Sequence, residues 1–189
     1  MNLAMAHSRF ARYASRGFTL IELMAVVVIV GLLAVAGVTL FRQNLQASKG
    51  NIAAAHIQAI RGAQEAYMAE NHIYMNASTS DEGKNWYPQR VPGPKRSAWV
   101  NSDHTDYVRW SQLAPAISGS VLFSFLTNAG GAGTAIPKLQ IANAPTFAAV
   151  QPLDWYVIQA SGDLNGNGKF SYYASTSITG ELYVENEGE

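Results

Sequence analysis

An acidic side chain lies within the longest apolar stretch of this chain. Glu22 follows Gly17 by five residues, and the 19 residues from Leu23 to Phe41 carry no formal charge. A carboxylate that enters lipid costs about 2.5–3.5 kcal/mol even on the lenient insertion scale. The acid therefore needs a partner or a task.

A second group of polar residues has the spacing of a cation-binding loop. Oxygen-bearing residues alternate along residues 163–171, and Gly168 occupies the sixth position, where a calcium loop turns sharply. The candidate calcium ligands are Asp163, Asn165, Asn167, the Lys169 carbonyl and Ser171. The pattern predicts a calcium site of low negative charge.

Two features of this loop favour a simpler interpretation. The twelfth position, which usually holds a bidentate glutamate, is Ala174. A missing carboxylate would have to come from elsewhere in the chain, with Asp154 and Glu181 as candidates. Asparagine and glycine also form hairpin turns without any metal. Calcium loop and bare turn therefore stay open as alternatives.

The apolar stretch around Glu22 is long enough to cross a membrane. A helix over Phe18–Phe41 would be about 36 Å long, against a hydrocarbon core of about 30 Å. Arg9, Arg12 and Arg16 precede it, with no acid among the first 17 residues. Positive charge beside a span stays on the cytoplasmic side, so we expect the residues after Phe41 to lie outside.

The segment Gly17-Phe18-Thr19-Leu20-Ile21-Glu22-Leu23-Met24 resembles the processing site of type IV prepilins and related pseudopilins, and the resemblance covers residues 9–45. It implies that a prepilin peptidase cuts between Gly17 and Phe18 and methylates the new amine of Phe18. It also implies that Glu22 meets the N-terminal amine of a neighbouring subunit and guides assembly. Glycine suits the cut because its backbone enters a protease site unobstructed.

Two ordinary kinds of membrane segment are alternatives to this interpretation. A secretory signal peptide has an apolar stretch of about 7–15 residues and a small-residue cleavage site beyond it. The stretch here is longer, and Arg42-Gln43-Asn44-Leu45 offers no such site. A plain anchor fits the length but explains neither Gly17-Phe18 nor Glu22.

The expected organisation has four parts. They are a cleaved leader over residues 1–17, a transmembrane and filament-core helix over 18–41, an amphipathic continuation over 42–72, and a β-rich head over 73–189. The continuation is predicted from Ala53, Ile57, Ile60 and Tyr67, which recur at helical spacing, and it ends near Asn71.

The head carries strand signals. We expect strands at residues 120–125, 155–160, 170–174 and 181–184, and a flexible run at 129–133. The predicted fold class is α+β: a long N-terminal helix, transmembrane in its inner half and amphipathic in its outer half, packed on a small antiparallel sheet. The sequence has no cysteine, so no disulfide closes the end of the head.

An aromatic, turn-rich loop is predicted between the helix and the first strand. Residues 77–96 contain three prolines, and five large rings lie in or just after this loop: Trp86, Tyr87, Trp99, Tyr107 and Trp110. Such rings usually anchor a loop to the core, and the alternative is a sugar- or surface-binding patch.

Composition and motifs exclude two functional classes. Basic and acidic side chains both number 13, and the chain without its leader is mildly acidic, so nucleic-acid binding has no electrostatic support. The four histidines show no metal-ligand spacing, and no nucleophile motif or phosphate-binding loop is present. We therefore expect a structural protein and not an enzyme.

The resemblance implies a subunit of a type IV pilus-like filament that polymerises with copies of itself through its N-terminal helix. Its implied partners are the prepilin peptidase, an inner-membrane assembly platform and a cytoplasmic ATPase. It would lie in the inner membrane before assembly and in an extracellular or periplasmic filament afterwards. Motility, adhesion, DNA uptake and secretion stay open as roles of that filament. Short strings in the head are similar to myxobacterial pilins. Alternatives are a type II secretion pseudopilin, a minor pilin or a low-copy anchored adhesin.

Overall fold

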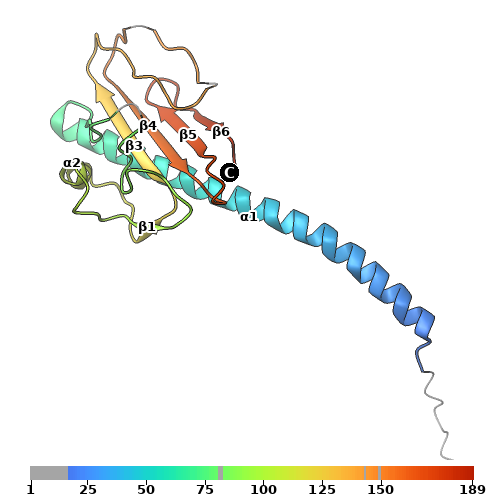
Figure 1. Cartoon of the computed structure of the whole chain (residues 1–189). Helices are drawn as coiled ribbons and strands as arrows, with labels where there is room; N and C mark the ends of the chain where they lie inside the picture. The colour runs from blue at the N-terminus through green and yellow to red at the C-terminus, as the bar shows by residue number, and fades with distance from the viewer. Residues whose placement is uncertain (1–16, 81–82, 143, 149) are drawn as a thin grey trace, which may run out of the picture. The chain divides into compact units, whose positions relative to one another are not determined.

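The computed structural model describes residues 17–80, 83–142, 144–148 and 150–189 (Figure 1). All of the predicted leader except Gly17 therefore lies outside the described residues. The chain divides into two units, Met1–Phe41 and Arg42–Glu189. One helix, α1, Leu20–Asn71, contributes to both units.

The described part of the first unit is a helix without a core. Leu20–Val38 has a mean hydropathy of 2.7, and its length and composition allow it to cross a membrane. Every side chain described between residues 17 and 41 is exposed within the subunit. This apolar surface therefore needs lipid or other protein to cover it.

The second unit contains a four-stranded antiparallel sheet (Figure 1). Its strands, in spatial and chain order, are β3 (Ser124–Gly130), β4 (Trp155–Gly162), β5 (Ser171–Thr176) and β6 (Leu182–Glu185). Ala160 pairs with Phe125 of β3 and with Tyr173 of β5, which fixes the register at the centre. The predicted α+β fold class is confirmed.

One face of this sheet packs on the second half of α1. Ala53, Ile57 and Ile60 have no exposed surface, and they join a core cluster that includes Phe125 and Ile158. Residues three or four apart lie on one side of a helix, so these positions form a single apolar stripe. The stripe joins the helix to the sheet.

A long loop covers the other face of the sheet. Leu139 and Ile141 of the β3–β4 connection are buried against Trp155, Val157 and Ala174. Successive residues of a strand point to opposite faces, so Trp155 and Val157 face this loop while their neighbours face α1. This double cover explains why every residue of β4 is buried.

Helix α1 ends where the sequence predicted. Its last residue is Asn71, and His72 adopts the left-handed conformation with φ 59°. The His72 amide donates to the Met68 carbonyl at 2.9 Å, and Asn71 Nδ2 donates to the Tyr67 carbonyl at 3.0 Å. These bonds satisfy carbonyls at the helix end, as is typical of a left-handed cap.

The predicted strand at residues 120–125 is not one strand. It divides into β2 (Ser120–Val121), which pairs with β1 (Ser97–Ala98), and into β3, which pairs with β4. The prediction missed β1 and the short helix α2, Tyr107–Leu113. The run at 129–133 is held by hydrogen bonds: the amides of Ala132 and Gly133 donate to Asp154 Oδ1 and the Gln151 carbonyl.

Candidate functional site

The peptide bond between Gly17 and Phe18 lies in non-helical backbone before α1. The Phe18 side chain is 83% exposed. A Cβ atom added to Gly17 would meet nothing within 4 Å. The described residues therefore leave this bond open to an enzyme and give no internal reason for the glycine.

Glu22 is hydrogen-bonded to Thr19, the residue just before its own helix. The Thr19 amide and hydroxyl both donate to Glu22 Oε2, at 2.9 and 2.8 Å, and the Glu22 amide donates to Thr19 Oγ1 at 3.3 Å. This reciprocal arrangement is a capping box, which satisfies amides that a helix start leaves unpaired. The carboxylate thus has a partner within its own subunit.

Sequence reasoning overlooked Thr19, although its signal was present. Threonine followed by glutamate three residues later, just before an apolar run, is the pattern of a capping box. The helix begins at Leu20 and not at Phe18 as expected, because Thr19 is its cap. Phe18 is therefore outside the helix. The distance from Phe18 to Glu22 cannot be calculated from the rise per residue of a helix.

Two glycines of the first unit have no packing reason within the subunit. A Cβ at Gly31 or Gly37 would meet nothing within 4 Å, and neither residue has positive φ. Glycine in a helix costs about 1 kcal/mol relative to alanine. In lipid, small residues let helices approach closely, so these positions mark a surface suited to a second helix.

The loop at residues 163–171 is a turn organised around a buried acid. Asp163 Oδ1 accepts hydrogen bonds from the amides of Gly166 and Asn167, and Oδ2 accepts one from Gly168. Asn165 Oδ1 accepts from the Asn167 amide at 2.9 Å, and Asn167 Oδ1 accepts from the Lys169 amide at 2.7 Å. Gly166 and Gly168 both have positive φ, a conformation that glycine adopts without strain.

Glu189 closes this turn from the far side of the sequence. Both asparagine side chains, Asn165 and Asn167, donate to Glu189 Oε2, at 3.1 and 2.7 Å. These bonds lower the pKa of the Glu189 carboxyl below its ordinary value. The Leu164 amide and the Ser171 hydroxyl donate to the Glu189 carbonyl. Hydrogen bonds thus hold the last residues of this cysteine-free sequence.

Glu189 was not among the carboxylates proposed for this loop, and neither alternative lies there. Asp154 is at the opposite end of β4, where it accepts the Ala132 amide. Glu181 precedes β6 and accepts the Tyr183 hydroxyl. Because β4, β5 and β6 are antiparallel, the start of β4 and the start of β6 lie at the same end of the sheet. Both acids are therefore at the end of the sheet opposite Asp163.

The donor set suits calcium in kind, since all the proposed ligands are oxygens. However, the oxygens of Asp163, Asn165 and Asn167 already accept amide hydrogen bonds within the turn. Among the described residues, no group of three or more acidic, histidine or cysteine side chains is placed to hold a metal. The turn is complete through its own hydrogen bonds, and the calcium site stays a prediction.

Most of the aromatic side chains near the predicted loop belong to the core. Tyr87, Trp99 and Trp110 are at most 7% exposed; the first and last stack at 5.1 Å between ring centroids, and Trp99 meets both edge-on. The Tyr87 hydroxyl donates to the Trp99 carbonyl at 2.7 Å. These three rings anchor the loop and are unavailable for adhesion. Trp86 instead packs near Tyr172, on the other face of the sheet.

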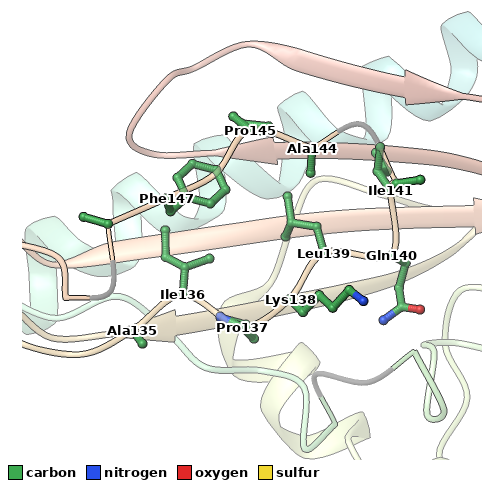
Figure 2. A pocket seen from close by; sticks show the side chains of 12 residues that line it. Ala135, Ile136, Pro137, Lys138, Leu139, Gln140, Ile141, Ala144, Pro145 and Phe147 are labelled. Atoms are coloured by element: carbon green, nitrogen blue, oxygen red, sulfur yellow. The ribbon is translucent and has the colours of Figure 1, made fainter.

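Two hollows lie on the face of the sheet opposite α1. The larger, about 690 Å³, is lined by residues 135–142, 144, 145, 147 and 148 of one loop, with Ile136, Leu139 and Phe147 turned toward one another (Figure 2). The smaller, about 280 Å³, lies beside Trp86 and Tyr172. Gln140 lines the larger hollow, and its side chain lies against Gly83, which lines the smaller one.

Comparison with known proteins supports the interpretation of the N-terminal segment. The family model described as the prokaryotic N-terminal methylation motif matches residues 12–38. This match, which includes Gly17, Phe18 and Glu22, supports a type IV pilin-like protein and implies processing by a prepilin peptidase. No curated protein and no solved structure matches the chain.

Proposed function

We propose that this chain is a structural subunit of a type IV pilus-like filament. Prepilin peptidase cuts it between Gly17 and Phe18 and methylates Phe18, and the subunit then polymerises through the first half of α1. It has no catalytic role of its own. An inner-membrane platform and a cytoplasmic ATPase drive its extraction from the inner membrane, with Arg9, Arg12 and Arg16 left on the cytoplasmic side.

The observation that carries this proposal is the uncovered helix surface next to the methylation motif. No described side chain of Leu20–Val38 is buried, and lipid covers such a surface before assembly. A filament of parallel helices replaces the lipid with identical apolar helices. Gly31 and Gly37 support this step, because they lower the helix radius where nothing inside the subunit requires it.

A further support is the state of Glu22. Its Oε2 is bound by Thr19, so the subunit tolerates the acid in lipid before a partner arrives. A neighbour's Phe18 amine would then add a charge-assisted bond. Removing one member of such a pair strands the other charge, so the pair selects register more than it adds stability.

Sheared surface filaments test the proposal. The chain should be their main component, and a Gly17→Val strain should yield none while the protein accumulates in the membrane. A Gly62→Ala strain is the control, because Gly62 has no close neighbours and lies outside the motif. Filaments that lack the chain, or that form normally in Gly17→Val, would contradict the proposal.

Abundance also separates the related possibilities. A major pilin dominates the filament, and the short strings of the head that resemble myxobacterial pilins favour a pilus subunit over a pseudopilin. A minor pilin, a pseudopilin or an adhesin is a trace component that is still processed at Phe18. We propose the major subunit, and a trace amount in filaments built from another protein would assign this chain to the second group.

A further inference from the structure

The smaller hollow of the head has the features of a ligand site. It is a cleft of about 280 Å³, slightly below the usual range of about 300–1,000 Å³ for small-molecule pockets, so it holds a single ring. Its lining includes Trp86, Phe170 and Tyr172 together with Pro92, Ser161 and Arg90. Apolar walls with a few polar groups are typical of such sites.

Three aromatic rings form a bent apolar wall. The Trp86 and Tyr172 ring centroids are 6.4 Å apart with planes inclined by 39°, and those of Phe170 and Tyr172 are 6.2 Å apart at 47°. Trp86 is fixed, since its Nε1 donates to the Gly83 carbonyl at 2.7 Å. Tyr172 is carried by β5. The wall is therefore built before any ligand binds, which lowers the entropic cost of binding.

Ser161 gives this cleft an unused hydrogen-bonding group. It is the register partner of Tyr172 in the neighbouring strand β4, and its side chain is 1% exposed. Its hydroxyl is buried and has no hydrogen-bond partner within the described parts of the chain. A buried polar group without a partner is unfavourable, so a ligand hydroxyl that bonded it would recover that cost.

Two cationic side chains, Lys84 and Arg90, line the cleft. Arg90 is exposed, lines the cleft, and presents a guanidinium that matches a carboxylate in a two-bonded geometry. Its backbone is anchored to the tryptophan of the wall, because the Arg90 carbonyl accepts the Trp86 amide at 3.3 Å. Aromatic wall and guanidinium are thus held together.

We propose that this cleft binds a sugar ring that carries a carboxylate, such as a uronic acid unit. One face of a pyranose ring consists of C–H groups and lies flat on aromatic rings. Its edge carries hydroxyls, one of which would bond Ser161, and its carboxylate would bond Arg90. A purely apolar ligand would leave Ser161 unpaired, and an extended peptide would exceed a cleft of this size. The assignment does not depend on filament assembly.

Saturation-transfer NMR on the full-length protein tests this proposal. The protein is held in a zwitterionic detergent, because sugar-headed detergents would compete. The probes are methyl glucuronide and methyl glucoside at millimolar concentration. We expect transfer from aromatic protons to the C–H protons on one face of the glucuronide, and weaker transfer to the neutral glucoside.

Matched variants locate the site. Ser161→Ala should weaken glucuronide binding about tenfold without lowering the melting temperature, because the hydroxyl makes no bond that folding needs. Ser175→Ala is the control: Ser175 is also buried with an unpartnered hydroxyl in the described structure, but it lies on β5 outside this cleft. Arg90→Gln should reduce the preference for glucuronide, although Lys84 remains in the lining, and exposed Lys95→Gln should not change it.

Two results would overturn the proposal. One is the absence of saturation transfer to either sugar in the folded wild-type protein. The other is transfer that is equal in wild type, Ser161→Ala and Arg90→Gln, which would place any binding elsewhere. Equal transfer to both sugars in wild type would overturn the role given to Arg90.

Discussion

Thr19 caps the helix that Glu22 supports, and a single carboxylate oxygen, Oε2, accepts both the amide and the hydroxyl of Thr19. The other direction is also used, since Thr19 Oγ1 accepts the Glu22 amide. The acid that the resemblance assigns to assembly therefore already has a structural task in the isolated subunit. Its second oxygen, Oε1, has no hydrogen bond in the described structure. Assembly can thus add a partner without removing the cap.

We expect Glu22→Ala to insert into the membrane but to assemble poorly or to lose the Phe18 methyl group. Insertion survives because the change makes the segment more apolar. Filament yield and the N-terminal mass measure the two effects. Thr19→Ser is the matched control, because it retains the hydroxyl that caps the helix. Normal yield with full methylation in Glu22→Ala would show that Glu22 has another task.

Gln64→Leu should destabilise the head by about 2 kcal/mol or more. Gln64 is fully buried in the apolar stripe of α1; its Nε2 donates to the Met75 carbonyl and Thr127 Oγ1, and its Oε1 accepts the Met75 amide. Leucine would leave these groups unpaired, at about 1–3 kcal/mol each. Thermal unfolding followed by circular dichroism should show a midpoint several degrees lower.

Gln58→Leu is the control for this experiment, since Gln58 is exposed on the same helix. Its midpoint should stay close to that of wild type. Equal effects of the two changes would mean that the Gln64 hydrogen bonds contribute nothing specific to folding.

Stability of the head should fall as pH drops below about 6.5, the ordinary pKa of histidine, partly because of His56. Burial lowers the pKa of His56 in the folded protein, and the positive charge of Arg96 lowers it further. Protonation of His56 therefore favours the unfolded chain. The contribution of neutral His56 to the stability of the fold is complete above about pH 6.5, and it is lost as pH falls through the lower folded-state pKa. His56→Gln removes the titrating group, so its melting temperature should fall less between pH 7 and pH 5.

The same change at an exposed position, His72→Gln, provides the comparison. It should retain the wild-type slope of melting temperature against pH. A His56→Gln slope identical to that of wild type would show that His56 does not contribute to the pH dependence.

The turn at Asp163 should hold without metal. Because Asp163 accepts three amide hydrogen bonds, Asp163→Ala should lower the melting temperature by several degrees, with or without a chelator. A chelator alone should leave the wild-type midpoint unchanged. Under the calcium alternative, bound calcium would stabilise the folded head by linkage, and the midpoint would rise. The stabilisation would be about 2.7 kcal/mol at a hundredfold excess over the dissociation constant. Scanning calorimetry with millimolar calcium and with chelator distinguishes the two outcomes.

Local patterns predicted the helix and most strands, because those elements depend on periodicity and on caps. The stripe through Ala53, Ile57 and Ile60 and the end at Asn71 are examples. The break within residues 120–125 was not predictable in this way. It arises because Val121 pairs with Ser97 while Ser124 pairs with Ser161, and such partners are distant in the sequence.

The candidate sites also differ in whether their residues are close together in the sequence. Glu22 is conspicuous in the sequence because it is a charge in an apolar run. The helix cap, Thr19, also has a local signal, since a threonine three residues before a glutamate is the pattern of a capping box. Glu189 was not predictable as the partner of Asn165 and Asn167. These residues are separated from it by 24 and 22 positions in the sequence, and only the fold brings them together. The cleft near Trp86 likewise joins two loops to two strands.

Replacements at Gly17 should separate processing by side-chain bulk. Gly17→Ala should be cut more efficiently than Gly17→Val, because a branched side chain restricts the extended backbone that a protease must bind. Neither should change the folded head, since a Cβ at Gly17 meets nothing within 4 Å. Immunoblots of membranes, with cut and uncut forms resolved by size, measure the ratio. Complete cutting of both variants would contradict a requirement for glycine.

The mature N-terminus tests the central claim most directly. Intact-mass and fragment-ion spectrometry of the chain purified from membranes or filaments identifies its first residue and any modification. We expect a chain that begins at Phe18, with one methyl group on its amine and with residues 1–17 removed. A chain that begins at any other residue, or an unprocessed Gly17–Phe18 bond in assembled filaments, would contradict it.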